Sequence, residues 1–172
     1  MPIPEVRTAR LVLRAPAPGD FDASLAMWTH PEVTRFIGRR PATREETWGR
    51  ILRYIGHWET FGWGFWTIAS HDGAFVGECG FADFHRELAP PIDAPEMGWA
   101  LSPGAHGRGY ASEAIAAACA WGDAHLDAPT VACIIHPENA PSLRVAEKLG
   151  FRELRRTEYR GDPTVVLERR RL

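Results

Sequence analysis

The hydrophobic positions of the 172-residue chain follow two periods, one typical of strands and the other of amphipathic helices. Period-two alternation or short apolar runs predict strands over residues 10–14, 62–69, 75–81, 96–101, 131–135, 152–159 and 164–170. Spacings of three and four predict helices over residues 20–28, 32–37, 43–58, 110–126 and 140–149. Strands and helices that follow one another in this order predict one mixed α/β domain over residues 1–172.

Several local signals set the bounds of these elements. Asp20 sits where it would cap the first helix, and Thr43-x-x-Glu46 is a capping-box pattern ahead of the long one. The tripeptide at 71–73 holds Asp-Gly between two aromatic-rich runs, which predicts a hairpin. Gly150 suits the left-handed position that ends a helix. The continuous apolar run at 131–135 is typical of a central strand covered on both faces.

Composition narrows the partners that we expect. Apolar residues make up 45% of the chain, charged residues 24%, and the net charge is −2, so there is no long-range field for nucleic acid. No apolar run approaches the roughly 18 residues of a membrane span, and the first residues lack the pattern of a signal peptide. We therefore expect a cytoplasmic protein without a nucleic-acid or membrane partner.

Cysteine and histidine give no sign of a metal site. The three cysteines are far apart and the seven histidines show no ligand spacing, so we expect buried free thiols and no bound metal.

The most informative stretch is the strand at 96–101, the loop that follows it and the start of the next helix. Glycines stand at 104, 107 and 109, where they allow the backbone to approach a ligand and to adopt positive φ. The first amides of a helix lack partners and the helix dipole favours an anion, so this stretch predicts a phosphate-binding loop. It lacks the Gly-Lys-Ser/Thr of a P-loop, and Ser112 replaces the last glycine of the dinucleotide fingerprint. A plain turn between strand and helix stays an alternative for this stretch alone.

Two motifs taken together resemble the GNAT superfamily of acyl-CoA-dependent N-acetyltransferases. His106-x-x-Gly109-x-Ala111 is similar to its pyrophosphate loop, with His106 in place of the usual Gln or Arg, and Asn139-x-x-Ser142 before residues 148–151 is similar to its second CoA-binding segment. The opening Thr8-x-Arg10-Leu11 and the phrase at 96–101 are similar to the RimJ/RimL-type branch, which acetylates protein N-termini.

The resemblance implies a central mixed, mostly antiparallel sheet with helices on both faces. It also implies acetyl-CoA as cosubstrate, no metal, and as acceptor a protein N-terminus or a small-molecule amine, with pairing into a homodimer as one assembly. Residues 30–60 and 84–95 would line the acceptor site. The residues that the resemblance assigns to CoA binding are Ala100, Leu101, His106, Gly107, Arg108, Gly109, Tyr110, Ala111, Ser112, Asn139, Ser142 and Lys148. Of these, Ala100 and Leu101 would donate amides to the thioester oxygen, beside a bulge in the strand.

Acetyl transfer to an amine requires a base, because most of the amine is protonated at neutral pH. Glu96 is the candidate, since it shares a strand face with Gly98 and Ala100, two small residues that would leave an open slot beside it. A salt-bridged or solvated glutamate stays an alternative reading, and Glu78 and Glu158 are lesser candidates for the base.

The resemblance assigns Ser142 as the acid for the leaving thiolate, with Tyr110 and Tyr159 as alternatives. Asn139 would cap the amide of Ser142 in either case. A covalent role for Cys119 or Cys133 is not expected, because the amine can attack directly.

Two competing functions use the same loop. A nicotinamide-dependent oxidoreductase needs the full fingerprint and an acidic residue after the next strand, whereas residues 131–135 end in His136-Pro137. A non-catalytic acyl-CoA sensor on the same fold remains the alternative to an acetyltransferase.

Overall fold

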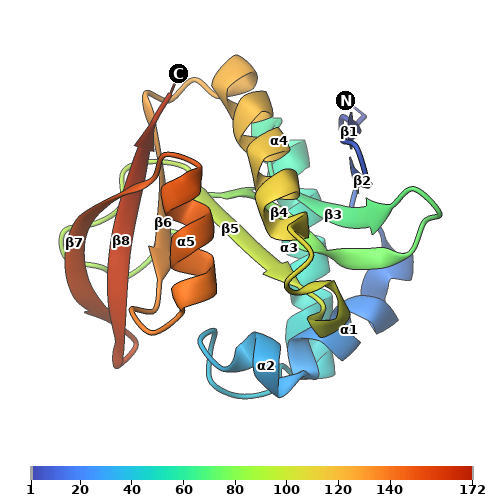
Figure 1. Ribbon diagram of the computed structural model, residues 1–172, viewed down its shortest axis with the longest axis horizontal. Helices are drawn as coiled ribbons and strands as arrows, with labels where there is room; N and C mark the ends of the chain where they lie inside the picture. Colours follow the sequence, from blue (N-terminus) through green and yellow to red (C-terminus); the bar gives the residue numbers. More distant parts are fainter. Residues whose placement is uncertain (1, 172) are drawn as a thin grey trace.

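The computed structural model of the protein describes residues 2–171. Within this range eight strands form one sheet in the order β1-β2-β3-β4-β5-β6-β8-β7 (Figure 1). The strands are β1 (Val6–Arg7), β2 (Leu11–Arg14), β3 (Phe65–Ser70), β4 (Phe75–Ala82), β5 (Glu96–Leu101), β6 (Thr130–Ile135), β7 (Arg152–Tyr159) and β8 (Asp162–Arg170). The β5–β6 pair is parallel and the other neighbours are antiparallel, which confirms the predicted mixed, mostly antiparallel sheet.

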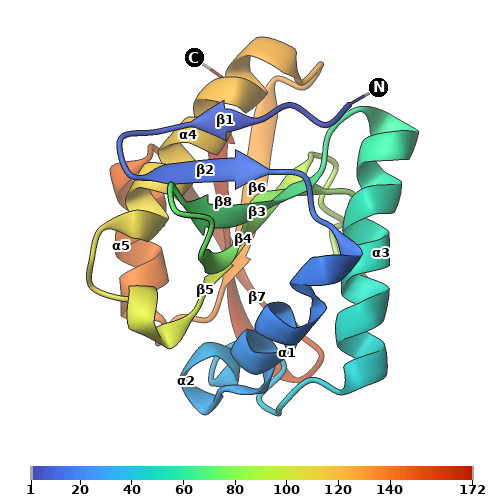
Figure 2. The same cartoon turned by 90° about the vertical axis from the view of Figure 1, so that its right-hand side faces the viewer.

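Helices cover both faces of this sheet (Figure 2). The helices are α1 (Phe21–Thr29), α2 (Pro31–Thr34), α3 (Arg44–Phe61), α4 (Tyr110–His125) and α5 (Ala140–Lys148), with short 3-10 turns η1 (Pro18–Asp20) and η2 (Pro103–Ala105). Helices α4 and α5 lie on one face, and α1 to α3 lie on the other. Successive side chains of β5 point alternately to these two helical layers. Leu101 packs in the cluster that includes Ile115 of α4, and Ala100 packs against Trp28 of α1.

Most local signals produce the predicted structure. In the capping box Thr43 Oγ1 accepts from the amide of Glu46 at 3.1 Å, and Glu46 accepts from the amide of Thr43 at 2.8 Å. Gly150 has a φ of 90° after α5, and the amide of Phe151 donates back to Ala146 at 3.0 Å. The helix expected over 32–37 is shorter than predicted, and the two-residue strand β1 has no periodicity that a sequence pattern could reveal.

Asp20 is the N-cap residue of α1, as predicted, but its side chain does not cap the helix. Its carboxylate makes no cap bond to α1 and accepts instead from the amide of Ala17, from Arg14 and from Thr67. Burial raises the pKa of Asp20, but the hydrogen bonds from Arg14, Ala17 and Thr67 outweigh it and hold that pKa below its ordinary value. Asp20 therefore ties the start of α1 to β2 and β3.

Candidate active site

The sheet splits between its two parallel strands. β5 and β6 pair at a single position, Glu96 with Ala132, next to a bond from the amide of Ala132 to Pro95 at 3.0 Å. Beyond it each strand follows its outer neighbour, β5 along β4 as far as Leu101 and β6 along β8 as far as Ile135. The gap therefore opens toward the carboxyl ends of both strands (Figure 1).

Unpaired amides of β5 face this gap. The amide of Ser102 donates to Val76 of β4 at 2.9 Å, and antiparallel pairing alternates, so Ala100 also bonds toward β4. The amides of Trp99 and Leu101 consequently point to the side from which β6 has diverged. The β4–β5 register runs without a shift from Leu101 to Glu96, so the expected bulge does not occur there. Of the two expected amide donors, Leu101 faces the gap and Ala100 does not.

The glycine loop leaves a row of free amides at the start of α4. Within residues 2–171, no hydrogen bond engages the backbone N–H groups of residues 107–112. Gly107 and Gly109 have φ angles of 71° and 75°, the left-handed conformation that glycine adopts without strain. Gly104 lies in η2 and does not use this freedom. Six free amides at a helix N-terminus suit the oxygens of a diphosphate.

Side chains from the N-terminal segment brace this loop. Arg10 donates to the carbonyl of Arg108 at 2.9 Å and to the carboxylate of Glu113 at 2.7 Å. The hydroxyl of Thr8 donates to the same carboxylate at 2.6 Å. Glu113 thus binds Arg10 and Thr8, and the amides of the first turn of α4 stay available. No sequence pattern indicated a role for Glu113, although its partners Thr8 and Arg10 belong to the opening motif.

Two side chains of the loop differ in what they offer a ligand. The Nε2 of His106 donates to the carbonyl of Leu101 at 2.8 Å, so this ring folds back onto β5. Arg108 is exposed, with its guanidinium carbon 4.8 Å from the centre of the Tyr110 ring, and can reach a phosphate. Ala111 and Ser112 are half-buried in the first turn of α4.

Helix α5 begins at the same end of the molecule as α4 (Figure 1). Asn139 caps it by accepting from the amide of Ser142 at 3.3 Å, as predicted, and Ser142 is half-buried. Lys148 is exposed in the last turn of this nine-residue helix, about 13 Å along its axis from the cap. The structure therefore places Asn139 and Ser142 at the start of α5, shortly after the carboxyl end of β6, and Lys148 at the other end of that helix.

Glu96 is the acidic partner of an ion pair. The residue is 4% exposed, and its carboxylate accepts from Nε of Arg86 at 2.7 Å and from Nη2 at 2.6 Å. Burial lowers the pKa of Arg86, but the hydrogen bond to Glu96, the negative charge of Glu96 and the interaction with Tyr159 together outweigh burial and raise that pKa above its ordinary value. The slot expected beside Glu96 is filled, because a Cβ on Gly98 would lie 2.8 Å from the ring of Phe65. These contacts argue against Glu96 as a freely available base.

Glu78 forms a second buried carboxylate site on the same face. It accepts from Ser24 at 2.5 Å, from Trp28 at 3.0 Å and from the Tyr54 hydroxyl at 2.9 Å. It lies opposite Ala100 in the β4–β5 register. Glu78 thus ties α1 and α3 to β4, the neighbour of the strand that borders the gap, a network that no sequence pattern indicated.

Burial makes Cys119 and Cys133 poorly suited to act as nucleophiles. Burial raises the pKa of Cys119 to about 11 and raises that of Cys133 well above its ordinary value. Both thiols therefore stay protonated and unreactive near neutral pH.

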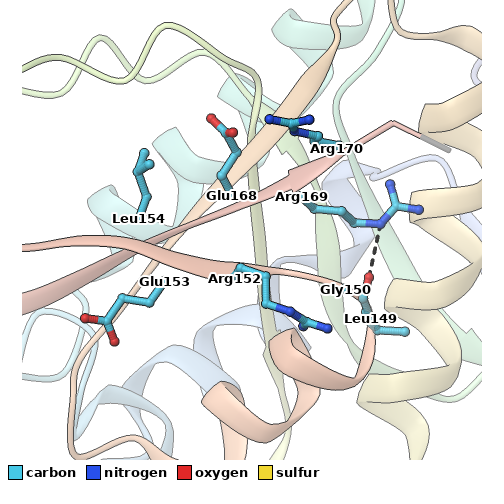
Figure 3. A pocket seen from close by; sticks show the side chains of 8 residues that line it. All are labelled: Leu149, Gly150, Arg152, Glu153, Leu154, Glu168, Arg169 and Arg170. Carbon is cyan, nitrogen blue, oxygen red and sulfur yellow. Dashed lines mark hydrogen bonds between the residues drawn. The ribbon is translucent and has the colours of Figure 1, made fainter.

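The surface of residues 2–171 includes two clefts, and one of them lies beside the glycine loop. A cleft of about 380 Å³ is lined by residues that follow α5 and by the β7–β8 hairpin (Figure 3). Arg169 crosses its inner end, where Nε donates to the carbonyl of Leu149 at 3.1 Å. Another cleft, of about 370 Å³, lies between α1 and Ser102-Pro103 at the start of the glycine loop.

Neither a metal site nor a membrane span is evident in the part of the chain that the structure describes. Residues 2–171 contain no group of three or more His, Cys, Asp or Glu side chains placed to hold a metal. Among the same residues, each helix is too short or too polar to cross a bilayer.

The comparisons with known proteins agree with this geometry. The family model described as the acetyltransferase (GNAT) domain matches residues 10–152. The uncharacterized N-acetyltransferase p20 of Bacillus licheniformis is 28% identical over 148 residues, which cover 85% of this chain and 81% of the relative. The solved acetyltransferase of Agrobacterium tumefaciens strain C58 is 30% identical with a TM-score of 0.84, covering 98% of this chain and 95% of that one. The protein is an acetyltransferase, and it belongs to the GNAT family.

A more distant structure shows the fold alone. RimL, described as a ribosomal L7/L12 alpha-N-protein acetyltransferase in complex with coenzyme A, is 17% identical with a TM-score of 0.78. The alignment covers 97% of this chain and 98% of RimL.

Proposed function

We propose that the protein transfers the acetyl group of acetyl-CoA to a primary amine in the gap between β5 and β6. The observation that supports this most is the convergence of unpaired backbone amides at one end of the molecule. Those of residues 107–112 would bind the diphosphate of CoA, with Arg108 as a charged partner. The divergence of β5 from β6 toward their carboxyl ends would leave space for the pantetheine arm.

Two groups in the gap suit the developing charges of the reaction. The amides of Trp99 and Leu101 face the space in which the thioester oxygen would gain charge, and fixed backbone donors are effective there. The hydroxyl of Ser142 would donate to the leaving thiolate, and the cap by Asn139 holds the backbone beside it in place. Tyr110 is the less suitable donor, since its ring packs between the guanidiniums of Arg10 and Arg108.

Glu96 has a different part in this proposal from the one predicted. Because its oxygens already accept from Arg86, we assign it the role of fixing that arginine beside the gap. An α-amine has an ordinary pKa of about 7.7–8.0, so roughly a tenth of it is neutral at pH 7 and can attack without a strong base. The site therefore suits an α-amine better than a lysine-type amine.

The acceptor in this proposal is the α-amine of a protein N-terminus or of a small molecule. The opening motif from Thr8 to Leu11 and the phrase at 96–101 favour the RimJ/RimL-like branch. The fold that the chain shares with RimL is compatible with that branch.

The test is release of free CoA thiol from acetyl-CoA with a panel of amines, with the acetylated product identified by mass spectrometry. Acceptor-dependent release together with an acetylated α-amine is the expected result. Tight binding of CoA without release for any acceptor would contradict the proposal and favour a non-catalytic sensor.

A further inference from the structure

A strip of arginine and aromatic side chains lies on the face of the sheet that α1 and α3 cover. The guanidinium carbon of Arg50 lies 3.8 Å from the ring centre of Trp28. That of Arg53 lies 5.3 Å from the ring centre of Phe84, and that of Arg86 lies 4.3 Å from the same ring. Stacking on aromatic rings holds guanidinium groups in fixed orientations. The strip is therefore a set of oriented cations.

One end of this strip is bonded to β4, the strand next to β5, and the other end is bonded to β5 itself. Trp28, which carries Arg50, donates to Glu78 at 3.0 Å, and Glu78 pairs in register with Ala100. At the other end Arg86 binds Glu96, the residue at which β5 and β6 separate. An acceptor that reaches the gap from the side of α1 and α3 therefore meets these cations.

Among the three arginines of the strip, within the described residues, only Arg86 forms an ion pair. Arg86 has Glu96 as its ion-pair partner. Within residues 2–171, Arg50 and Arg53 have no carboxylate within salt-bridge distance, and the buried Nε of Arg50 has no hydrogen-bond partner. Glu78 is buried and accepts three bonds from uncharged donors. Arg50 and Arg53 therefore have no carboxylate in an ion pair, although the charge of Glu78 acts on Arg53 from a greater distance.

We propose that the acceptor amine carries a carboxylate or a similar anion, which Arg50 and Arg53 bind. This inference rests on the proposed transfer of an acetyl group to an amine. Guanidinium groups bind carboxylates through two parallel charge-assisted bonds, and here they are already oriented. A polyamine would instead bring positive charge next to unpaired arginines. A free amino acid and an acidic N-terminal peptide share the required chemistry.

Matched acceptors test the proposal on the unmodified protein. Thiol release from acetyl-CoA is measured with free amino acids and their amides, with tetrapeptides that are acidic or neutral after the first residue, and with spermidine. The expected result is a kcat/KM about tenfold or more higher for the anionic member of the best pair. The amino-acid and peptide arms show which source of the anion the protein prefers.

Variants then locate the selectivity. Arg50→Gln and Arg53→Gln should each lower kcat/KM for the anionic acceptor about tenfold, mainly through KM, with little change for its amide. Arg44→Gln is the control, because Arg44 also lies in α3 and stacks on an aromatic ring, that of Phe21, outside the strip. Affinity for CoA, measured by calorimetry, should stay unchanged in the three variants.

The possible failures are distinguishable. Equal or higher kcat/KM for the amides or for spermidine, or an equal loss for acid and amide in Arg50→Gln, would overturn this inference alone. Absence of thiol release with every acceptor, in protein that binds CoA, would overturn the proposed function and this inference with it.

Discussion

The ion pair of Glu96 and Arg86 allows a quantitative test of what Glu96 does. Replacing Glu96 with Gln would leave the guanidinium of Arg86 without its counter-charge, in a site where the two side chains are 6% and 19% exposed. Breaking a buried ion pair on one side costs about 3–5 kcal/mol, and the remaining exposure of Arg86 reduces this to about 2–3 kcal/mol. For a chain of this length that corresponds to a fall in Tm of roughly 4–12 °C.

Thermal unfolding and a double-mutant cycle would measure this effect. Arg86→Met combined with Glu96→Gln removes both charges, and the double variant should be more stable than Glu96→Gln alone. If Glu96 only holds Arg86 in place, the pH–rate profile of Glu96→Gln should keep the shape that it has in the unmodified protein. A Tm that does not change, together with loss of the acidic limb of the pH–rate profile, would refute this reasoning and return Glu96 to the role of base.

Three further predictions concern the glycine loop, the leaving group and acid stability. Gly107→Ala and Gly109→Ala should each cost about 1–2 kcal/mol of unfolding free energy and weaken CoA binding, because both positions have positive φ. Gly104→Ala, whose new Cβ meets no atom within 4 Å, is the matched control in urea unfolding and calorimetry, and equal effects at the three positions would contradict the loop assignment. Ser142→Ala should lower kcat several-fold with an unchanged KM for acetyl-CoA in steady-state kinetics, and an unchanged kcat would remove Ser142 from the mechanism. Asp20 has a lowered pKa, so its stabilisation is present above its ordinary value of about 3.9 and is lost as pH falls through the lowered one. Asp20→Asn should flatten that part of the Tm–pH curve, and a curve parallel to that of the unmodified protein would contradict the contacts described for Asp20.

The parts of the fold that the sequence predicts are those governed by local spacing. The capping box at Thr43 and Glu46, the left-handed Gly150 and the glycine loop before α4 each depend on residues within a few positions of one another. Their geometry follows from backbone preferences that single residues carry.

The parts that the sequence does not predict depend on distant contacts. The split between β5 and β6 results from pairing with β4 and β8, which come from separate segments of the chain. The partner of Glu96 is Arg86 in the preceding loop, and the space beside Gly98 is taken by Phe65 of β3. The periodicity of the sequence does not reveal contacts between distant segments. For this reason Glu96 is predicted to be a free base, whereas in the structure it is the ion-pair partner of Arg86.

The proposal depends on the free amides at the start of α4 binding the diphosphate of CoA. Titration of ¹⁵N-labelled protein with CoA, followed by amide NMR signals, tests this directly, with pantetheine as the matched ligand that lacks the diphosphate. The expected result is that CoA shifts the amide signals of residues 107–112 most strongly and that pantetheine leaves them nearly unmoved. Saturation with CoA without movement of these signals, or equal shifts with pantetheine, would contradict the central claim.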